Sequence, residues 1–262
     1  MPYDGVTQYA TAFSNSPSTS HTIALNSTFI TDANNATGTG SGAGYVHIML
    51  LHENDFTEDA TLLNQPSTTG GFIGTADAAR FSTMEDGTSA NRPSLVLKDA
   101  SGSTIATVSP NSSGNLDDGY FFASSNLLGL SSGVEARNSA VANSITQSLT
   151  NALAGHAKVS FFGSIYWILY RMFLSFELGL IPSSSTIASA DLNLTQSANQ
   201  TGFFPISSTK KTYLCKAASI GSGWVVADYN NLDNWRSSGT YEAEEGEEEA
   251  VTYNANFFGS NF

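Results

Sequence analysis

The chain has 262 residues and a formal net charge of −13 at pH 7, and 13% of its residues are charged. Hydrophobic residues at 40% provide enough apolar surface to offset the entropy of ordering, which excludes an intrinsically disordered chain. The negative charge repels phosphate backbones, which excludes nucleic-acid binding through a basic surface. The single cysteine, Cys215, excludes an intrachain disulfide, and we expect it to be buried.

The N-terminal segment Met1–Val6 contains neither a basic region nor an apolar run. It therefore predicts no secretory signal and a protein that is assembled in the cytoplasm of its host.

The first expected strands are short apolar stretches separated by Gly, Asn, Asp and Pro. They cover Tyr45–Leu51, Leu95–Lys98 and Thr104–Val108.

The segment Ala136–Ala154 is the one place where the sequence indicates a helix. Apolar residues recur there every four positions from Val141 to Leu153, and Gly155 follows as a C-cap. The segment is also rich in Ser, Thr and Asn, which compete for helical hydrogen bonds. A loop between strands therefore remains the alternative.

The apolar run Val159–Ile181 is long enough to span a membrane. Within it, however, Arg171 and Glu177 would both lie in hydrocarbon, which costs several kcal/mol. The residues around Arg171 also alternate between apolar and polar, which is the period of a strand. The run therefore predicts two strands of a core, interrupted at Gly163, and no membrane contact.

Strands continue to the C-terminal end. A turn at Pro182 precedes an alternating stretch that ends at Leu194. The run Tyr241–Ala250, with six glutamates in ten positions, is expected to be a solvated loop. Further strands are expected at Thr212–Ala217, Trp224–Ala227 and Val251–Tyr253. This regular series predicts an all-β fold, an antiparallel β-sandwich of jelly-roll type.

Three sequence blocks carry a family resemblance. They read Arg171-Met-Phe-Leu-Ser-Phe-Glu-Leu-Gly-Leu-Ile-Pro182, Thr186-Ile-Ala-Ser-Ala-Asp-Leu-Asn-Leu194 and Asn91-Arg-Pro-Ser-Leu-Val-Leu-Lys98. The first two resemble the opening strands of the DNRLRE or disaggregatase-like β-sandwich module, and the third resembles its closing phrase. That module recurs in extracellular proteins and in phage virion proteins, so the resemblance implies a structural role.

The closing phrase lies about 80 positions before the opening strands, which reverses the order of the module. The expected organisation is an N-terminal β unit over residues 1–100 with the closing half, a junction over 101–118, and a C-terminal sandwich unit over 119–262 with the opening half. Either the halves close on each other within one chain, or each subunit completes its neighbour. A half-sandwich alone would expose sheet edges and an apolar face, so one of the two must hold.

No catalytic residue, cofactor site or metal site is predicted. The four histidines show no ligand spacing, and the glycine run Gly38–Gly44 lacks the Lys-Ser/Thr that completes a phosphate loop. Acidic pairs such as Asp117 with Asp118 are expected by chance in a chain with 23 acids, although calcium binding by such a pair stays open. Trp235, in a polar loop, is the candidate for contact with a ligand.

We therefore expect a non-enzymatic structural protein of a phage virion or similar assembly, in which it decorates a capsid or forms a fibre. Its partners would be further copies of itself and other virion proteins such as a capsid or tail protein. A carbohydrate-binding or host-adhesion module, with glycans as partners, and a subunit of an extracellular filament are the alternatives. The residues expected to form the assembly and core strands are Arg171, Leu174, Phe176, Leu178, Ile187, Leu192, Leu194, Arg92, Pro93, Leu95 and Leu97.

Overall fold

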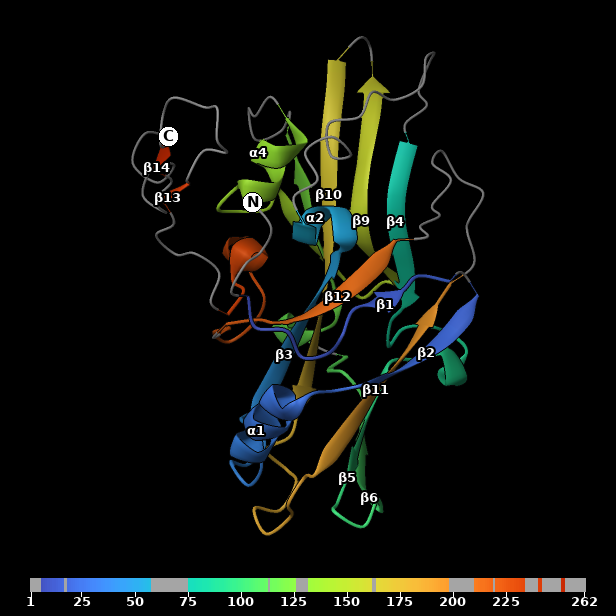
Figure 1. Cartoon of the computed structure of the whole chain (residues 1–262), viewed down its shortest axis with the longest axis vertical. Coiled ribbons are helices and arrows are strands. Elements are labelled where there is room, and N and C mark those ends of the chain that lie inside the picture. Colours follow the sequence, from blue (N-terminus) through green and yellow to red (C-terminus); the bar gives the residue numbers. More distant parts are fainter. Residues whose placement is uncertain are drawn as a thin grey trace.

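The structure, a computed structural model, has an all-β antiparallel fold, which confirms the expected fold class (Figure 1). It describes residues 6–16, 18–57, 75–112, 114–125, 132–161, 164–197, 210–218, 220–233, 240–241 and 251–252. Strands in this part of the chain join into a 12-stranded sheet, and β13 (Thr240–Tyr241) pairs separately with β14 (Val251–Thr252). The large sheet folds over itself, so that two groups of strands enclose a common core.

The first group contains four strands in the spatial order β2, β11, β5, β6. Their bounds are Thr19–Ala24 for β2, Ser189–Gln196 for β11, Ser94–Lys98 for β5 and Thr104–Val108 for β6. β11 lies in the middle, since Leu192 pairs with Ile23 of β2 on one side and with Leu95 of β5 on the other. This group occupies the lower right of Figure 1.

The second group is organised around β10, which is the longest strand of the described part. Residues 164–170 of β10 pair with β9, residues 168–173 with β7, and residues 172–177 with β3. The group consists of β1 (Phe13–Ser14), β3 (Tyr45–His52), β4 (Thr75–Ser82), β7 (Gly119–Ser124), β8 (Ser144–Gln147), β9 (Asn151–Phe161), β10 (Ser164–Glu177) and β12 (Lys211–Lys216). β4 links the two groups through the pair Phe81 and Gln196.

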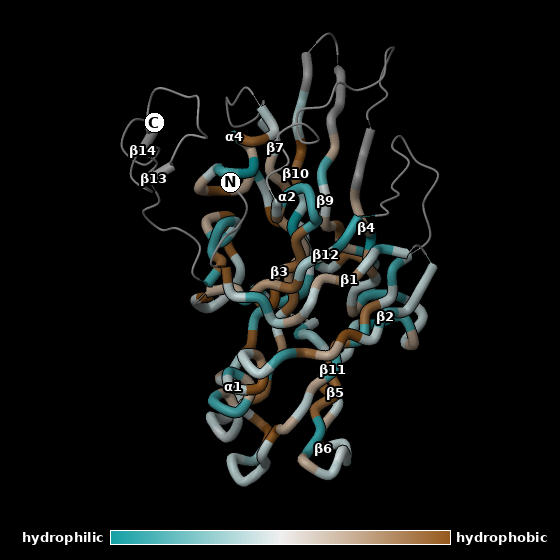
Figure 2. Tube along the Cα trace, viewed as in Figure 1, coloured by the Kyte–Doolittle hydropathy of each residue, from teal (hydrophilic) through white to brown (hydrophobic). Residues whose placement is uncertain are grey.

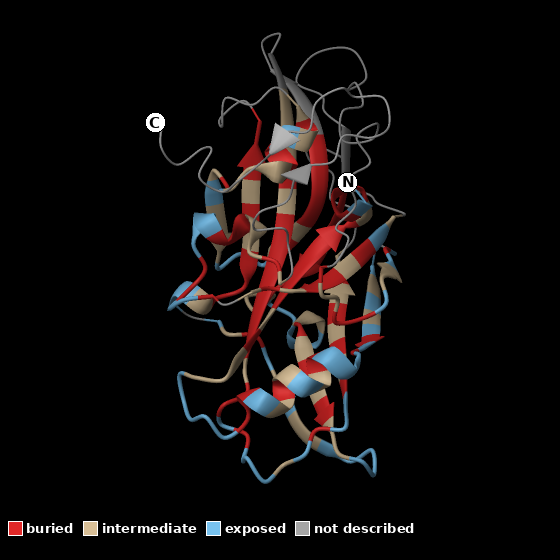
Figure 3. Ribbon diagram, turned by 60° about the vertical axis from the view of Figure 1, so that its left-hand side comes forward, coloured by how far each residue is buried: buried red, intermediate tan, exposed pale blue. Residues whose placement is uncertain are grey.

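Short helices cover the ends and faces of the strands. The helices are α1 (Ser27–Ala36), α2 (Glu53–Thr57) and α4 (Gly133–Asn138), with 3-10 turns η1 (Ser89–Asn91), η2 (Gly114–Leu116) and η3 (Val226–Asn230). Asn26 caps α1 by accepting a hydrogen bond from the Phe29 amide at 3.2 Å. Figure 3 shows that α1 keeps an exposed side, while its buried residues pack into the core. No helix of the described part combines the length and hydropathy that a membrane span requires.

The main core lies between the two groups of strands. Alternate residues of β10 point into it, and they meet apolar residues of β3, β5, β11 and β12 and of helix α1. The intervening residue Phe173 points to the opposite face, where it packs with Met49, Phe121 and Trp224 in a second cluster. β3 and β10 are thus buried on both faces, and Figure 2 shows hydrophobic residues concentrated along β3 in the middle of the molecule.

The expected alternation in the run Val159–Ile181 is confirmed: β9 ends at Phe161, β10 begins at Ser164, and both are strands. Five further predicted strands are also confirmed, with boundaries that agree to within one residue. They correspond to β3, β5, β6, β12 and β14. The alternating stretch that ends at Leu194 forms β11.

The helix predicted over Ala136–Ala154 is wrong. Only α4 lies there, and β8 and β9 follow it. In β9 the small residues Ala152 and Ala154 point into the core while their neighbours do not, which is the pattern of a strand. Two members of the supposed apolar stripe, Val141 and Leu149, are exposed. Pairing with β4 and β10 therefore outweighed the weak helical period.

The strand predicted over Trp224–Ala227 is also wrong, since η3 begins at Val226. The carboxylate of Asp228 accepts a hydrogen bond from the Val225 amide at 2.9 Å and so caps the turn. Trp224 itself is buried.

Strands of the expected N-terminal and C-terminal units interleave. β3 lies between β10 and β12, and β11 lies between β2 and β5. The stretch 101–118, expected as a junction, contributes β6 and η2. Within this one chain, the two parts therefore build their core together.

Candidate functional site

The most extensively bonded polar group of the second cluster is Arg171, in the middle of β10. Its guanidinium is fully buried and makes a bidentate ion pair with Asp55 of α2, at 2.7 Å from Nε to Oδ2 and 2.9 Å from Nη2 to Oδ1. Arg171 lies between apolar neighbours on a doubly buried strand, so its charge needs a carboxylate inside the protein. Asp55, itself fully buried, provides it.

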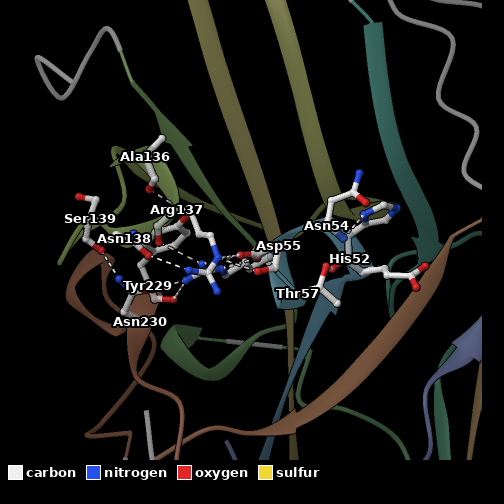
Figure 4. Close-up of polar contacts among 12 residues, drawn as sticks. His52, Asn54, Asp55, Thr57, Ala136, Arg137, Asn138, Ser139, Tyr229 and Asn230 are labelled. Carbon is white, nitrogen blue, oxygen red and sulfur yellow. Dashed lines mark hydrogen bonds and ion pairs between the residues drawn. The ribbon is translucent and has the colours of Figure 1, made fainter. Parts of the chain in front are cut away.

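Further acceptors surround the same guanidinium, and Figure 4 labels the residues that provide them, Arg137, Tyr229 and Asn230. It donates to the backbone carbonyls of Tyr229 at 2.8 Å and Arg137 at 3.1 Å, and to the side-chain oxygen of Asn230. The Tyr229 ring lies against it, with 4.0 Å from Cζ to the ring centroid. Arg171 therefore holds η3 and α4 against the central strand through directed contacts as well as through charge.

A second buried arginine, Arg137 of α4, approaches the same carboxylate. Its Nε donates to the Asp55 carbonyl at 2.6 Å and lies 3.4 Å from Asp55 Oδ1. Its Nη1 donates to the side-chain oxygen of Asn138 at 2.8 Å. The network of Asp55, Arg137, Arg171, Tyr229 and Asn230 thus connects four segments that lie far apart in the sequence. We call it the Arg171 network.

The Arg171 network is closed to solvent, which decides what it can do. Asp55, Arg137 and Arg171 are each at most 2% exposed, so a substrate cannot reach their polar atoms. Removing one member of such a pair costs about 3–5 kcal/mol, because it leaves a buried charge without a partner. The geometry is that of a structural ion-pair network that holds α2, α4 and η3 against β10, not of a catalytic centre.

The Cys215 thiol lies on the same face of the sheet. It is fully buried, as the sequence predicted, and burial together with the negative charge of Asp55 raises its pKa. Burial likewise raises the pKa of the Tyr229 hydroxyl. Both groups therefore stay protonated near neutral pH, so Cys215 does not provide a thiolate nucleophile.

A group of acidic side chains in another part of the chain, two of them buried, could hold a metal ion. One carboxylate oxygen from each of Glu85, Asp117 and Asp118 lies within 4.8 Å of the others. The sequence pointed to the pair Asp117 and Asp118 but not to Glu85, which lies 32 positions earlier. An acidic residue in the turn after a strand is too common to be found as a ligand by its type alone.

A surface recess of about 360 Å³ lies beside α1 and β3. Its lining includes Tyr9, Asp32, His47 and Lys216. Asp32 is engaged there, since it accepts hydrogen bonds from the Tyr9 hydroxyl at 2.8 Å and from Lys216 Nζ at 3.2 Å. The charges of Asp32 and Lys216, which both line the recess, are therefore paired with each other.

The structure places the predicted residues as follows. Leu174, Phe176, Leu178, Ile187, Leu192, Leu194, Leu95 and Leu97 all lie in the main core. Pro93 is buried, and Arg92 is half-buried and donates from Nε to the Asp86 carbonyl at 2.9 Å. Trp235, the candidate for ligand contact, lies outside the described residues. Trp167 is half-buried.

Two of the four histidines are buried and two are half-buried. His52 and His156 were not expected to meet, yet their rings lie 5.9 Å apart because β3 and β9 both flank β10. Both side chains are buried.

The partners of Arg171 were not predicted. The alternation along β10 indicates only that Arg171 faces away from Leu174, and its carboxylate lies 116 positions earlier in the chain. An arginine between apolar residues is a signal that some carboxylate will be buried with it. It does not say which one.

The fold is that of an all-β antiparallel protein of sandwich type. The Arg171 network holds α2, α4 and η3 against β10 through buried charges. Comparisons of the chain with protein-family models, curated proteins and solved structures find no match.

Proposed function

We propose that this chain is a non-enzymatic structural subunit of a phage virion or a similar assembly, and that it acts through contacts between subunits. The observation that supports this best is the character of the two outer strands of the first group, β2 and β6. Their edges contain neither the charges nor the prolines with which proteins normally block unwanted strand pairing.

β6 has the sequence TIATV, and in the described part of the chain it pairs with β5 alone. Thr104 and Thr107 of β6 are exposed. β2, at the opposite side of the same group, reads TSHTIA and pairs with β11 alone among the described strands. Each strand has a second edge whose backbone groups can pair with a strand of another subunit.

Such edges can assemble copies of the chain in two ways. Pairing of β6 with β6 of a second copy is self-complementary and stops at a dimer. Pairing of β6 with β2 of the next copy uses two different surfaces, and therefore continues into a ring or a fibre. The second arrangement suits capsid decoration in rings or a fibre subunit.

The pairing of β5 with β11 also supports the proposal. β5 contains most of the block that resembles the closing phrase of the DNRLRE-like module, and β11 contains most of the second opening block. Leu95 pairs with Leu192, and Lys98 Nζ lies 2.7 Å from Asp191 Oδ2. The two blocks thus meet inside one chain, as a permuted module requires. Exchange of halves between neighbours would use these same contacts across two chains.

The test is the molar mass of the full chain, measured by size-exclusion chromatography with light scattering at low and high concentration. Salt should be at least 0.15 M, because the net charge of −13 opposes association when it is unscreened. We expect mass to rise with concentration, and Thr107→Lys to reduce this association at least tenfold. Thr31→Lys, which places the same charge on the exposed side of α1, is the matched control.

A mass of 27.6 kDa at every concentration would contradict assembly through strand edges. Association that Thr107→Lys and Thr31→Lys weaken equally would show that charge, not the β6 edge, controls it. A dimer that forms slowly from unfolded chain and does not dissociate on dilution would instead indicate exchange of halves.

A further inference from the structure

The acidic group of Glu85, Asp117 and Asp118 is built from two separate segments. Glu85 lies in the turn that follows β4, and the two aspartates lie between η2 and β7. Asp117 is 2% exposed and Asp118 is not exposed at all. Carboxylates are seldom buried to this extent without hydrogen-bond donors or a positive charge beside them. The groups that contact each carboxylate oxygen therefore show whether such compensation is present.

Each aspartate has one oxygen that is satisfied by the protein. Asp118 Oδ2 accepts a hydrogen bond from the Met84 amide at 3.0 Å, and Asp117 Oδ2 accepts one from the Ser148 hydroxyl at 2.6 Å. These bonds fix the two carboxylates, because the donors lie on the turn after β4 and at the end of β8. The ligand geometry is therefore set in advance by the strands.

The remaining oxygens have no donor. Asp117 Oδ1, Asp118 Oδ1 and Glu85 Oε2 are buried and accept no hydrogen bond from the described residues. No lysine or arginine of the described part makes an ion pair with any of the three carboxylates. A buried, unbonded carboxylate oxygen is costly, and three that converge need a positive charge between them.

The proximity of the three carboxylates agrees with this requirement. Two of them are buried and all three lie close together, so their negative charges repel one another. A cation between them would relieve this repulsion.

We propose that Glu85, Asp117 and Asp118 bind a calcium ion. The ligand set consists of oxygen atoms alone, which hard cations prefer. Oxygens within 4.8 Å of one another can share a Ca²⁺, whose bonds to oxygen are about 2.4 Å long. Ca²⁺ accepts irregular coordination by several oxygens, whereas Mg²⁺ requires near-octahedral geometry and releases its water reluctantly. Water would complete the coordination.

The site would join the turn after β4 to the start of β7. The two segments already meet through the hydrogen bond from Met84 to Asp118. A bound Ca²⁺ would add a second connection between them, and it would stabilise the folded chain in proportion to the free ion.

The experiment uses the full chain, freed of metal with EDTA and dialysed into a metal-free buffer. Ca²⁺ binding is measured by isothermal titration calorimetry, and the melting temperature is measured with Ca²⁺, with Mg²⁺ and without metal. Asp118→Asn removes one ligand charge with little change in shape. Asp99→Asn, at a half-buried aspartate in the turn between β5 and β6, is the matched control.

We expect one Ca²⁺ per chain, a melting temperature that rises by several degrees in millimolar Ca²⁺, and a weaker response to Mg²⁺. Asp118→Asn should reduce Ca²⁺ affinity at least tenfold while the metal-free protein melts at the same temperature or higher, because a buried charge is removed. Asp99→Asn should bind as the unaltered chain does. Glu85→Gln repeats the test should Asp118→Asn fail to fold.

Three outcomes would overturn the proposal. The first is absence of any Ca²⁺-dependent heat or change in melting temperature between pH 6 and pH 8, which would assign the site to a shared proton. The second is equal Ca²⁺ binding by Asp118→Asn, Glu85→Gln and Asp99→Asn, which would mean non-specific binding to an acidic protein. The third is tighter binding of Mg²⁺ than of Ca²⁺.

Discussion

Arg171 and Asp55 lie 116 positions apart in the sequence, yet they form a fully buried bidentate ion pair at 2.7 and 2.9 Å. Arg171 is central to β10, and Asp55 lies in the short helix α2 that follows β3. The pair can therefore form only when β3 and β10 lie side by side in the sheet.

Asp55→Asn should lower the free energy of unfolding by about 3–5 kcal/mol, because it leaves the guanidiniums of Arg171 and Arg137 buried without their carboxylate. Urea denaturation followed by circular dichroism would measure the change. Lys98→Met, at the partly exposed ion pair with Asp191, is the control and should cost no more than about 1 kcal/mol. Equal effects of the two substitutions would contradict the assigned role of the Arg171 network.

Combining Asp55→Leu with Arg171→Met should destabilise the chain less than the sum of the two single substitutions. Each single change leaves a buried charge, whereas the double change leaves none on these two residues. A double-mutant cycle in urea would measure the coupling, which we expect to exceed about 1.5 kcal/mol. Additive effects would show that the two side chains do not interact.

Acidification should destabilise the protein through His47. Burial lowers the pKa of His47 from 6.5 to about 4. Its Nδ1 lies 2.9 Å from Ser175 Oγ, which accepts a hydrogen bond from Trp224 Nε1 at 2.8 Å. The Ser175 hydroxyl hydrogen can therefore be donated to a neutral His47, whereas protonation of the ring would reverse this bond and place a charge where little water can solvate it.

The folded pKa of His47 is below the unfolded one, so the stabilising contribution of the neutral ring is fully present above pH 6.5. It is lost as the pH falls from 6.5 towards 4, by up to about 3 kcal/mol. Unfolding by urea at pH 7.5 and pH 4.5 would measure this loss, and His47→Gln should show a smaller one. An unchanged pH dependence in His47→Gln would assign the effect to other groups.

Gly44, which precedes β3, should not tolerate a side chain. Its φ is +65°, and a Cβ there would lie 2.2 Å from the Ala36 carbonyl oxygen. Gly44→Ala combines this overlap with the strain of a left-handed residue, so we expect a loss of about 3 kcal/mol or more. Thermal unfolding would measure it.

Gly102 is the matched control for Gly44. Its φ is +83°, but nothing lies within 4 Å of the position that a Cβ would occupy. Gly102→Ala should therefore lower the free energy of unfolding by only about 1–2 kcal/mol, which is the strain of a left-handed backbone alone. Equal losses at the two positions would mean that the contact with α1 does not matter.

Most of the strands could be predicted because their signal is local. Side chains of a strand alternate between two faces, so the apolar positions Met172, Leu174 and Phe176 identify one face of β10 without any knowledge of its neighbours. The helix predicted over Ala136–Ala154 failed for the converse reason. Its spacing of four was weak, and pairing of β9 with β4 and β10 decided the outcome.

The acidic group shows the same limit for a candidate site. Asp117 and Asp118 are adjacent, so the sequence could present them as a pair. Glu85 joins them only because the turn after β4 folds back to meet the start of β7. Burial of their oxygens is not encoded in the spacing.

The sequence by itself determined the all-β class, the strand character of the run around Arg171 and the burial of Cys215, because each follows from residue type and local period. The tertiary structure alone decided that strands from both halves of the chain interleave, that Asp55 is the carboxylate buried with Arg171, and that Glu85 completes the acidic group. Those outcomes depend on contacts between distant segments, whose free energies arise only when the strands pair and water is excluded from between them.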